Sequence, residues 1–332
     1  MRKFILHTAI FVAPLVILAF ITDRFINYTL TTSKTGDYAV WNDILEGDVD
    51  ADIVIYGSSR AWLHLNPKII EDSTGVSTYN LGIDGHNFYM QYLRHDLLLK
   101  YNRPPATIIL SLDNFTFDKK KELYNSEQFL PYLDNKEILD ATKTYFGFDY
   151  YDYRLPLIRY AGQKDALKNA LKIIIKPSLN HIDRYKGYSG QELVWNNDLD
   201  RAIAIQKKYV QHFDSATITL FDQFLRETLA KKIEIIMVYS PEYIGGQQFV
   251  SNRKQVFSIY DSFSRKYKIP FFDYSDDSMS LNKDYFYNSQ HLNSNGANIF
   301  TRKVIHDIKD FRKEKLFKNQ HPVGAYSSVI RN

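Results

Sequence analysis

Cysteine is absent from the 332 residues of this chain. Disulfide scaffolds, thiolate zinc sites and cysteine nucleophiles are therefore excluded. The chain also lacks a strong net charge, because 42 Lys and Arg residues stand against 38 Asp and Glu residues. Such a balance does not by itself favour nucleic-acid binding. His, Asp and Glu are nowhere grouped at the spacing of metal ligands, so the sequence predicts neither a metal nor a cofactor.

Long apolar runs are missing everywhere except at the N-terminus, where Phe4 to Ile21 contain no Asp, Glu, Lys or Arg. A membrane-spanning helix needs about 17–25 mostly apolar residues. Arg2 and Lys3 precede the run, and such residues stay cytoplasmic. A cleaved signal peptide is the alternative, but its apolar region is shorter and no clear A-x-A site precedes Asp23. We expect an uncleaved single-pass anchor over 1–26, with the remainder outside the cytoplasm.

Beyond a stalk expected over 27–51, short apolar runs alternate with helical patterns. Strands are predicted at 52–57, 77–82, 106–113, 232–240 and 269–274. Helices are predicted at 61–73, 86–99, 216–231, 253–267 and 295–313. This alternation predicts an α/β domain over 52–316, with a parallel sheet and helices on both faces.

Residues 115–215 break the alternation and are expected to form a helical insertion. Six of the nine residues from 145 to 153 are Tyr or Phe. The stretch either stacks on sugars or packs the insertion onto the core. Lysines recur every four residues from Lys164 to Lys176, which suits anionic lipid or an acidic glycan but is by default a solvated face. A flexible tail is expected over 317–332.

The first strand leads into Gly57-Ser58-Ser59-Arg60. In open α/β sheets, ligands bind beyond the carboxyl ends of the strands, and a helix that starts there offers free N–H groups to an oxyanion. A serine hydroxyl needs a base within hydrogen-bonding reach. The tetrapeptide alone is also compatible with an ordinary helix cap.

Three further segments place polar groups where they can meet this serine. The second strand ends in Asn80-Leu81-Gly82-Ile83-Asp84-Gly85, and the third in Ser111-Leu112-Asp113-Asn114. Near the C-terminus, 285–293 includes Asn288 and His291 and precedes the last helix. The carboxyl ends of parallel strands share one edge of a sheet, so we expect the four segments to converge.

Together these segments resemble the SGNH (GDSL-like) hydrolase superfamily, over about 50–115 and 230–310. The closest resemblance is to the membrane-anchored branch that works beside membrane-bound O-acyltransferases in polysaccharide O-acetylation. The resemblance implies an SGNH/flavodoxin-like three-layer fold. It makes Ser59 the nucleophile, His291 the base, and Gly85 or, less favoured, Gly82 the oxyanion glycine.

Two positions depart from the family pattern. Asn288 stands where the family has the Asp of the triad, and Asp113 stands where it has the oxyanion Asn. Asn288 can leave a slow Ser-His dyad, Asp284 can supply the carboxylate instead, or catalysis has been lost. Asp113 would oppose an oxyanion when ionised, and Asn114 can donate only if the strand end is shifted by one residue.

The sequence therefore predicts a bacterial inner-membrane protein whose soluble domain faces the periplasm or exterior. Ser59 is expected to carry an acyl group, acetyl by resemblance, to or from a cell-surface polysaccharide as O-acetyltransferase or acetylesterase. Arg60 is expected to contact the substrate, with a salt bridge as the alternative. The alternative function is a catalytically impaired glycan-binding accessory protein that partners a membrane O-acyltransferase.

Overall fold

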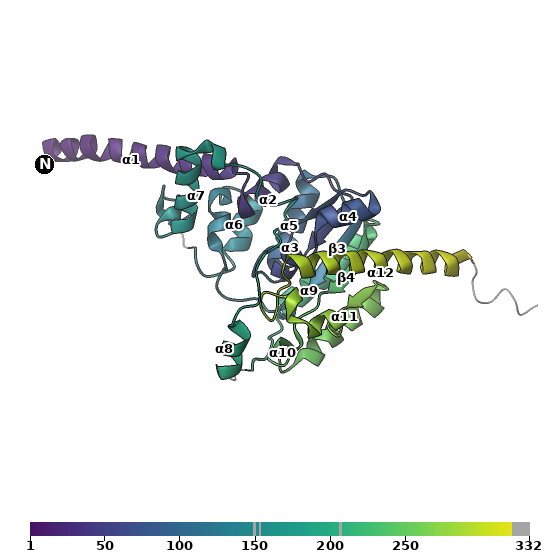
Figure 1. Ribbon diagram of the computed structural model, residues 1–332. Helices are drawn as coiled ribbons and strands as arrows, with labels where there is room; N and C mark the ends of the chain where they lie inside the picture. Colours follow the sequence, from purple (N-terminus) through teal and green to yellow (C-terminus); the bar gives the residue numbers. More distant parts are fainter. Residues whose placement is uncertain (149–150, 153, 206–207, 321–332) are drawn as a thin grey trace, which may run out of the picture.

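The computed structural model describes residues 1–148, 151–152, 154–205 and 208–320 (Figure 1). Its sheet has the order β2-β1-β3-β4-β5, and every pairing is parallel. The strands are β1 (Ile53–Tyr56), β2 (Thr78–Asn80), β3 (Thr107–Leu112), β4 (Glu234–Tyr239) and β5 (Phe271–Asp273). All five predicted strands are confirmed, each shorter by one or more residues at its ends.

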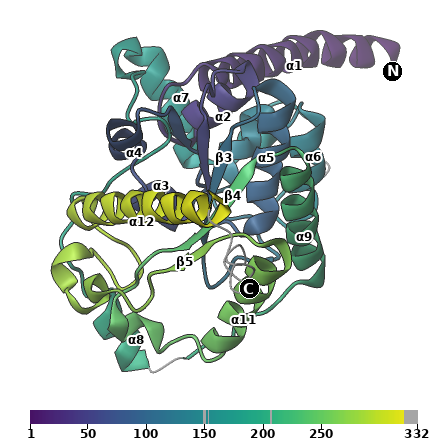
Figure 2. The ribbon, with the colours of Figure 1, turned by 90° about the vertical axis from the view of Figure 1, so that its right-hand side faces the viewer.

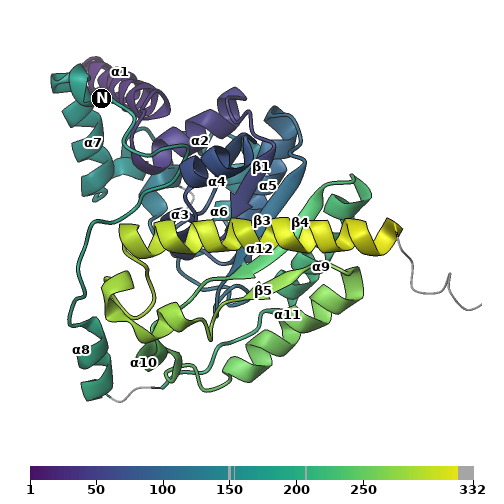
Figure 3. The same ribbon diagram turned by 45° about the vertical axis from the view of Figure 1, so that its right-hand side comes forward.

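Helices cover both faces of this sheet, because side chains alternate along each strand. Ile53 and Ile55 face a core shared with α3 (Ser59–His64), α4 (Pro67–Thr74) and α12 (Ser294–Gln320). Val54 and Tyr56 face the opposite core. That core includes α2 (Gly36–Glu46), α5 (Phe88–Tyr101), α9 (Ser215–Ala230) and α11 (Arg253–Tyr267). Figures 2 and 3 show α12 on one side of the sheet and α5 and α9 on the other, which confirms the three-layer α/β class.

One predicted helix, 61–73, is in fact two. The break falls between α3 and α4, where Pro67 occupies the first position of α4 and the Asn66 side chain accepts a hydrogen bond from Lys68 N. Proline suits the first turn of a helix but interrupts its interior. The break lets α3 remain a short helix whose first residue is Ser59.

The N-terminal helix α1 (Arg2–Thr31) leaves the domain and is apolar along its first two thirds (Figure 1). Among the described residues it alone is long and apolar enough to cross a membrane, a property that a signal sequence shares. Its last turns are buried at Asn27 and Leu30. The expected stalk over 27–51 is wrong, because α2 follows at once and buries Trp41 and Ile44 completely.

The insertion is helical, as predicted. It contains η1 (Ser126–Tyr132), α6 (Lys136–Thr142), η2 (Ile158–Tyr160), α7 (Lys164–Ile175), η3 (Pro177–Leu179) and α8 (Asp198–Ile205). Its first part packs on α1 and α2, where Trp41 Nε1 donates to Gln128 Oε1 at 3.0 Å. The short elements α10 (Ile244–Gln247), η4 (Ser278–Leu281) and η5 (Lys283–Tyr285) complete the domain.

The aromatic stretch and the lysine-rich helix have mixed surroundings. Tyr145 is buried against Tyr89, with ring centroids 5.9 Å apart, whereas Phe146 is 68% exposed. Residues 149–150 and 153 of the stretch lie outside the described residues. In α7, Ala166 and Ala170 are buried and the lysines are exposed. Most of the predicted tail, 321–332, also lies outside the described residues, and α12 extends to Gln320.

Candidate active site

The strand order reverses at the centre of the sheet. The chain passes from β1 to β2 on one side and then to β3 on the other, so β1 and β3 lie next to each other at the point where the order reverses. Open α/β sheets bind ligands in this position. Ser58 and Ser59 follow β1 there, and Asp113 and Asn114 follow β3.

A tight turn brings Ser59 to the start of α3. Gly57 has φ +150°, and a Cβ atom there would lie 2.7 Å from the Ser111 carbonyl oxygen, so no larger residue fits. Ser58 caps the helix by accepting a hydrogen bond from Arg60 N at 3.4 Å. As the first residue of α3, Ser59 directs its Oγ to His291 Nε2 at 2.8 Å.

The amide of Asn288 fixes the protonation of that histidine. Asn288 Oδ1 lies 3.1 Å from His291 Nδ1 and also accepts the backbone N–H groups of Gln290 and His291, each at 2.9 Å. These two backbone donors require an oxygen, so they assign the amide orientation. His291 Nδ1 must then carry the proton, which leaves Nε2 free to accept the Ser59 hydroxyl proton.

His291 is also held in its neutral form. The Tyr287 ring stacks on the imidazole at a centroid distance of 5.5 Å and an interplanar angle of 8°. Burial, followed by the positive charge of Arg60, lowers the pKa of His291 to about 4. A neutral imidazole at pH 7 is the form that a general base requires.

A second histidine, His64 at the end of α3, supports the loop of the base. It is fully buried, and its Nε2 accepts the backbone N–H of Leu292 at 3.0 Å. Its Nδ1 therefore carries the proton and donates to Ser240 Oγ at 2.9 Å. The sequence offers one signal for this role, the position of His64 five residues after Ser59. Tyr287 and Ser240 have no comparable signal.

Two backbone N–H groups remain for an oxyanion. Gly85 has φ +68°, and a Cβ atom there would lie 2.3 Å from the Tyr124 ring, which explains the glycine. Within the described residues, neither the Gly85 N–H nor the Ser59 N–H has a hydrogen-bond acceptor. The Gly82 N–H, by contrast, donates to Asn80 Oδ1 at 2.9 Å. Of the two predicted glycines, only Gly85 therefore has an N–H left to donate, and its oxyanion role stays a prediction.

The side chains of Asp113 and Asn114, predicted at the oxyanion site, have other partners in the structure. Asp113 is buried, and its Oδ2 accepts the Ser58 hydroxyl at 2.6 Å. Burial raises the pKa of Asp113, although Arg60 opposes the shift. Asn114 Nδ2 donates one of its two hydrogens to Glu242 Oε1 at 2.8 Å. Both side chains belong to a polar cluster beneath the nucleophile.

Arg60 is the centre of that cluster and is not a substrate contact. Its guanidinium is 3% exposed and donates to Ser240 Oγ and Glu242 Oε1, each at 3.1 Å. It also lies 4.4 Å from the centroid of the Tyr239 ring. A buried cation needs such partners. The salt-bridge interpretation of Arg60 is therefore the right one.

Asp284 does not take the place of the missing triad acid. Its side chain is exposed, and Asn288 makes the contact with His291 Nδ1. The Asp284 carbonyl oxygen instead accepts Asn293 Nδ2 at 2.8 Å, which helps to close the loop before α12. No group of three or more His, Asp or Glu side chains within the described ranges is arranged to hold a metal.

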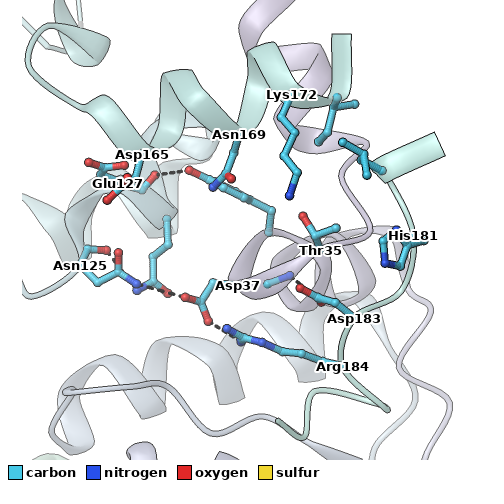
Figure 4. A pocket seen from close by; sticks show the side chains of 15 residues that line it. Thr35, Asp37, Asn125, Glu127, Asp165, Asn169, Lys172, His181, Asp183 and Arg184 are labelled. Carbon is cyan, nitrogen blue, oxygen red and sulfur yellow. Dashed lines mark hydrogen bonds and ion pairs between the residues drawn. The ribbon is translucent and has the colours of Figure 1, made fainter. Parts of the chain in front are cut away.

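A polar cavity of about 370 Å³ lies between α2, η1, α7 and the segment 179–184 (Figure 4). Asp37 accepts hydrogen bonds there from Arg184 at 2.7 Å and Asn125 at 3.0 Å. Burial would raise the pKa of Asp37, but the Arg184 guanidinium holds it below its ordinary value. The Arg184 guanidinium also lies 4.8 Å from the centroid of the Trp62 ring, and Trp62 follows Ser59 by about one turn of α3. Arg184 thus links the cavity to α3, although no predicted site residue lines the cavity.

No family model matches the chain, and no curated protein matches it. The chain is similar to several solved structures, including the following three. A putative acylhydrolase from Bacteroides fragilis is 15% identical at TM-score 0.36, with 82% of this chain and 95% of that chain covered. An acetyl xylan esterase is 11% identical at TM-score 0.39, with 77% and 99% covered. A GDSL-like lipase from Bacteroides thetaiotaomicron is 14% identical at TM-score 0.36, with 82% and 96% covered.

A putative acylhydrolase and a GDSL-like lipase are thus among the solved structures similar to this chain. Overlap at these TM-scores carries no argument about chemistry. The assignment of the site rests on the strand order and on the contacts of Ser59 with His291 and of His291 with Asn288.

Proposed function

We propose that this protein is a membrane-anchored, SGNH-like acyl-transfer enzyme that moves an acetyl group to or from a cell-surface polysaccharide. One observation carries the proposal. Ser59 Oγ lies 2.8 Å from His291 Nε2, and His291 Nδ1 lies 3.1 Å from an Asn288 oxygen whose orientation two backbone donors fix. This is the order of nucleophile, base and orienting group that serine-dependent acyl transfer uses.

The reaction follows from the positions of these atoms. His291 Nε2 takes the Ser59 proton while Oγ forms a bond to the acyl carbon, and the N–H groups of Ser59 and Gly85 stabilise the oxyanion. The ester C–O bond then breaks, and His291 gives the proton to the leaving alcohol. Water or a sugar hydroxyl resolves the acyl-enzyme by the same steps in reverse.

Asn288 is expected to limit the rate of the proposed acyl transfer. In a serine protease, replacing the triad Asp with Asn costs about 10⁴ in kcat, in part because the amide favours the wrong tautomer. The fixed Oδ1 of Asn288 avoids the wrong tautomer but supplies no negative charge for the imidazolium. We therefore expect turnover between that of a full triad and that of a protein without a base.

The polar cavity supports a carbohydrate as the second substrate. Its walls combine acceptors such as Asp165 and Asp183 with donors such as Lys172 and Arg184. Figure 4 shows Lys172 extending into the space between them. A sugar presents hydroxyl groups that both donate and accept, and so can use both kinds of partner. The cavity volume, about 370 Å³, is in the range of small-ligand sites.

The length of α1 and the two basic residues before its apolar run support an anchor in a bacterial inner membrane, with the domain outside. A membrane-bound O-acyltransferase is the partner that we propose for such a protein. It would supply acyl groups from the cytoplasmic side, and Ser59 would receive or remove them outside.

A fluorophosphonate probe tests the enzyme directly. We would treat the detergent-solubilised full chain and locate the adduct by mass spectrometry. We expect labelling of Ser59 that is lost in Ser59→Ala and His291→Ala. The exposed Ser258 on α11 provides a control, and Ser258→Ala should be labelled like the wild type. A folded protein that stays unlabelled would contradict the proposed serine-dependent activity and favour the accessory glycan-binding function.

A further inference from the structure

The insertion meets α1 at the level where its apolar run ends. Asp23 follows Ile21 by two residues, which is about 3 Å along a helix axis. Asp23 Oδ1 accepts the backbone N–H of Leu157 at 2.9 Å, and Oδ2 pairs with Arg159 at 3.3 Å. These contacts are buried. They fix the start of η2 beside the first turn of α1 beyond the apolar run.

Apolar and aromatic side chains are exposed at this level. On the insertion, Tyr151 is 58%, Leu155 46% and Ile158 41% exposed. A turn joins the first two, because Leu155 N donates to the Tyr151 carbonyl oxygen at 2.9 Å. On α1, Phe25 is 52% and Tyr28 67% exposed. We call these five side chains the collar.

We propose that the collar rests in the interfacial layer of a lipid bilayer, so that the insertion as well as α1 holds the domain on the membrane. This inference rests on the membrane anchor of the proposed function. Tyrosine at the membrane surface keeps its ring in the apolar zone and its hydroxyl in water, and aromatic residues are enriched there. Leu155 and Ile158 lose their exposed apolar surface to lipid, which is favourable at about 25 cal/mol per Å².

The collar adjoins the part of α1 that is proposed to cross the membrane, so lipid is the partner that we propose for it. A span that ends near Ile21 brings the headgroups to the level of Asp23, and Leu157, which is bonded to Asp23, lies between Leu155 and Ile158 in the chain. A carboxylate at this depth is costly unless it is paired. Arg159 and the Leu157 N–H supply its partners from the insertion. The same contacts therefore neutralise Asp23 and bring Leu155 and Ile158 to the membrane surface.

The absence of cysteine allows a direct test with single labels. Leu155→Cys and Ile158→Cys would each carry an environment-sensitive nitrobenzoxadiazole group on the full chain. The protein would be placed in nanodiscs of phosphatidylethanolamine and phosphatidylglycerol with nitroxide-labelled lipids. Ile10→Cys, within the apolar run, reports whether α1 is inserted. Val194→Cys reports the background, because Val194 is 85% exposed and lies four residues before α8 in the chain. Figure 1 shows α8 away from α1.

We expect headgroup nitroxides to quench the labels at 155 and 158 at least twofold more than the label at 194. Equal quenching at 155, 158 and 194, with strong quenching at 10, would overturn the collar and leave the anchor intact. A label at 10 that is not quenched would overturn anchor and collar together. Labels at 155 and 158 that iodide cannot reach and lipids do not quench would indicate a protein partner and also overturn the proposal. Thermal unfolding of each variant checks its fold.

Discussion

The loop before α12 and the turn after β3 each differ at one position from the motif that the sequence resembles. The first has the amide of Asn288 in place of a carboxylate, and the second has the carboxylate of Asp113 in place of an amide. Asn288 stands where the motif that the sequence resembles has a carboxylate, and it still contacts His291, because two backbone N–H groups turn its oxygen toward the ring. Asp113 replaces an amide and leaves the oxyanion site, because the Ser58 hydroxyl and Arg60 hold it below the nucleophile. A departure from a motif therefore alters chemistry only as far as the neighbouring donors and charges permit.

The largest effect is expected at the base. His291→Ala should lower kcat for p-nitrophenyl acetate by about 10⁴-fold or more, because removing one member of such a relay costs nearly as much as removing all. Release of nitrophenolate from the full chain measures it. His306 on α12 is 73% exposed at its side chain, and His306→Ala provides the matched control that should keep wild-type activity. A loss below tenfold for His291→Ala would remove His291 from the mechanism.

Substitutions of Asn288 should separate the effect of orienting the His291 ring from the effect of a negative charge beside it. We expect Asn288→Ala to lower kcat/KM about 10²-fold, since the imidazole loses its acceptor, and Asn288→Asp to raise it about tenfold, since a carboxylate stabilises the imidazolium. Steady-state kinetics of the two variants checks both directions. If Asn288→Asp is no faster than the wild type, the relay is not limited by the missing charge.

Asp113 should behave as a stability residue. Asp113→Ala leaves the Ser58 hydroxyl and part of the Arg60 charge without partners, at a cost of about 2 kcal/mol in the free energy of unfolding. Urea unfolding measures the cost. Glu242 still pairs with Arg60, so the protein should remain folded. An unchanged midpoint together with lost activity would restore Asp113 to the reaction and reverse the comparison with Asn288.

The pH dependence of kcat/KM should also differ between the wild type, with an amide beside His291, and Asn288→Asp, with a carboxylate there. With the pKa of His291 lowered to about 4, the wild-type kcat/KM should stay level from pH 7 down and fall only as the pH passes through about 4. The added carboxylate of Asn288→Asp favours the imidazolium, so its acid limb should lie at higher pH. Rates between pH 3.5 and 8 test this. A wild-type acid limb near 6.5 would contradict the buried, neutral base.

The smallest effect per residue is expected in stability at acid pH. Burial lowers the pKa of His86 to about 4 and of His95 to about 3, and lowers that of His64 also. Below the ordinary histidine value of about 6.5 the unfolded chain binds protons that the native protein does not. The free energy of unfolding should therefore fall by about 1 kcal/mol per histidine for each pH unit below 6.5. Urea unfolding at pH 7 and 5 measures the sum, and His95→Gln should reduce the slope.

The sequence alone located the strands and most helices, and it singled out Ser59 and His291, which the structure brings into contact. Apolar periodicity is local, so it located all five strands and most helices. Ser59 and His291 were found because each stands at a fixed place next to an element that periodicity reveals. The helix 61–73 was mistaken as continuous because its apolar pattern spans the break, although Pro67 was visible.

Only the tertiary structure decided the partners. The hydrogen bonds of Asn114 and Arg60 depend on Ser240 and Glu242, which lie more than 120 positions further along the chain. The orientation of the Asn288 amide depends on two backbone N–H vectors that sequence does not specify. The expected stalk became α2 because the insertion supplies a core for Trp41. Local pattern fixes which residues form helices and strands, whereas hydrogen-bond partners and burial arise only when distant segments meet.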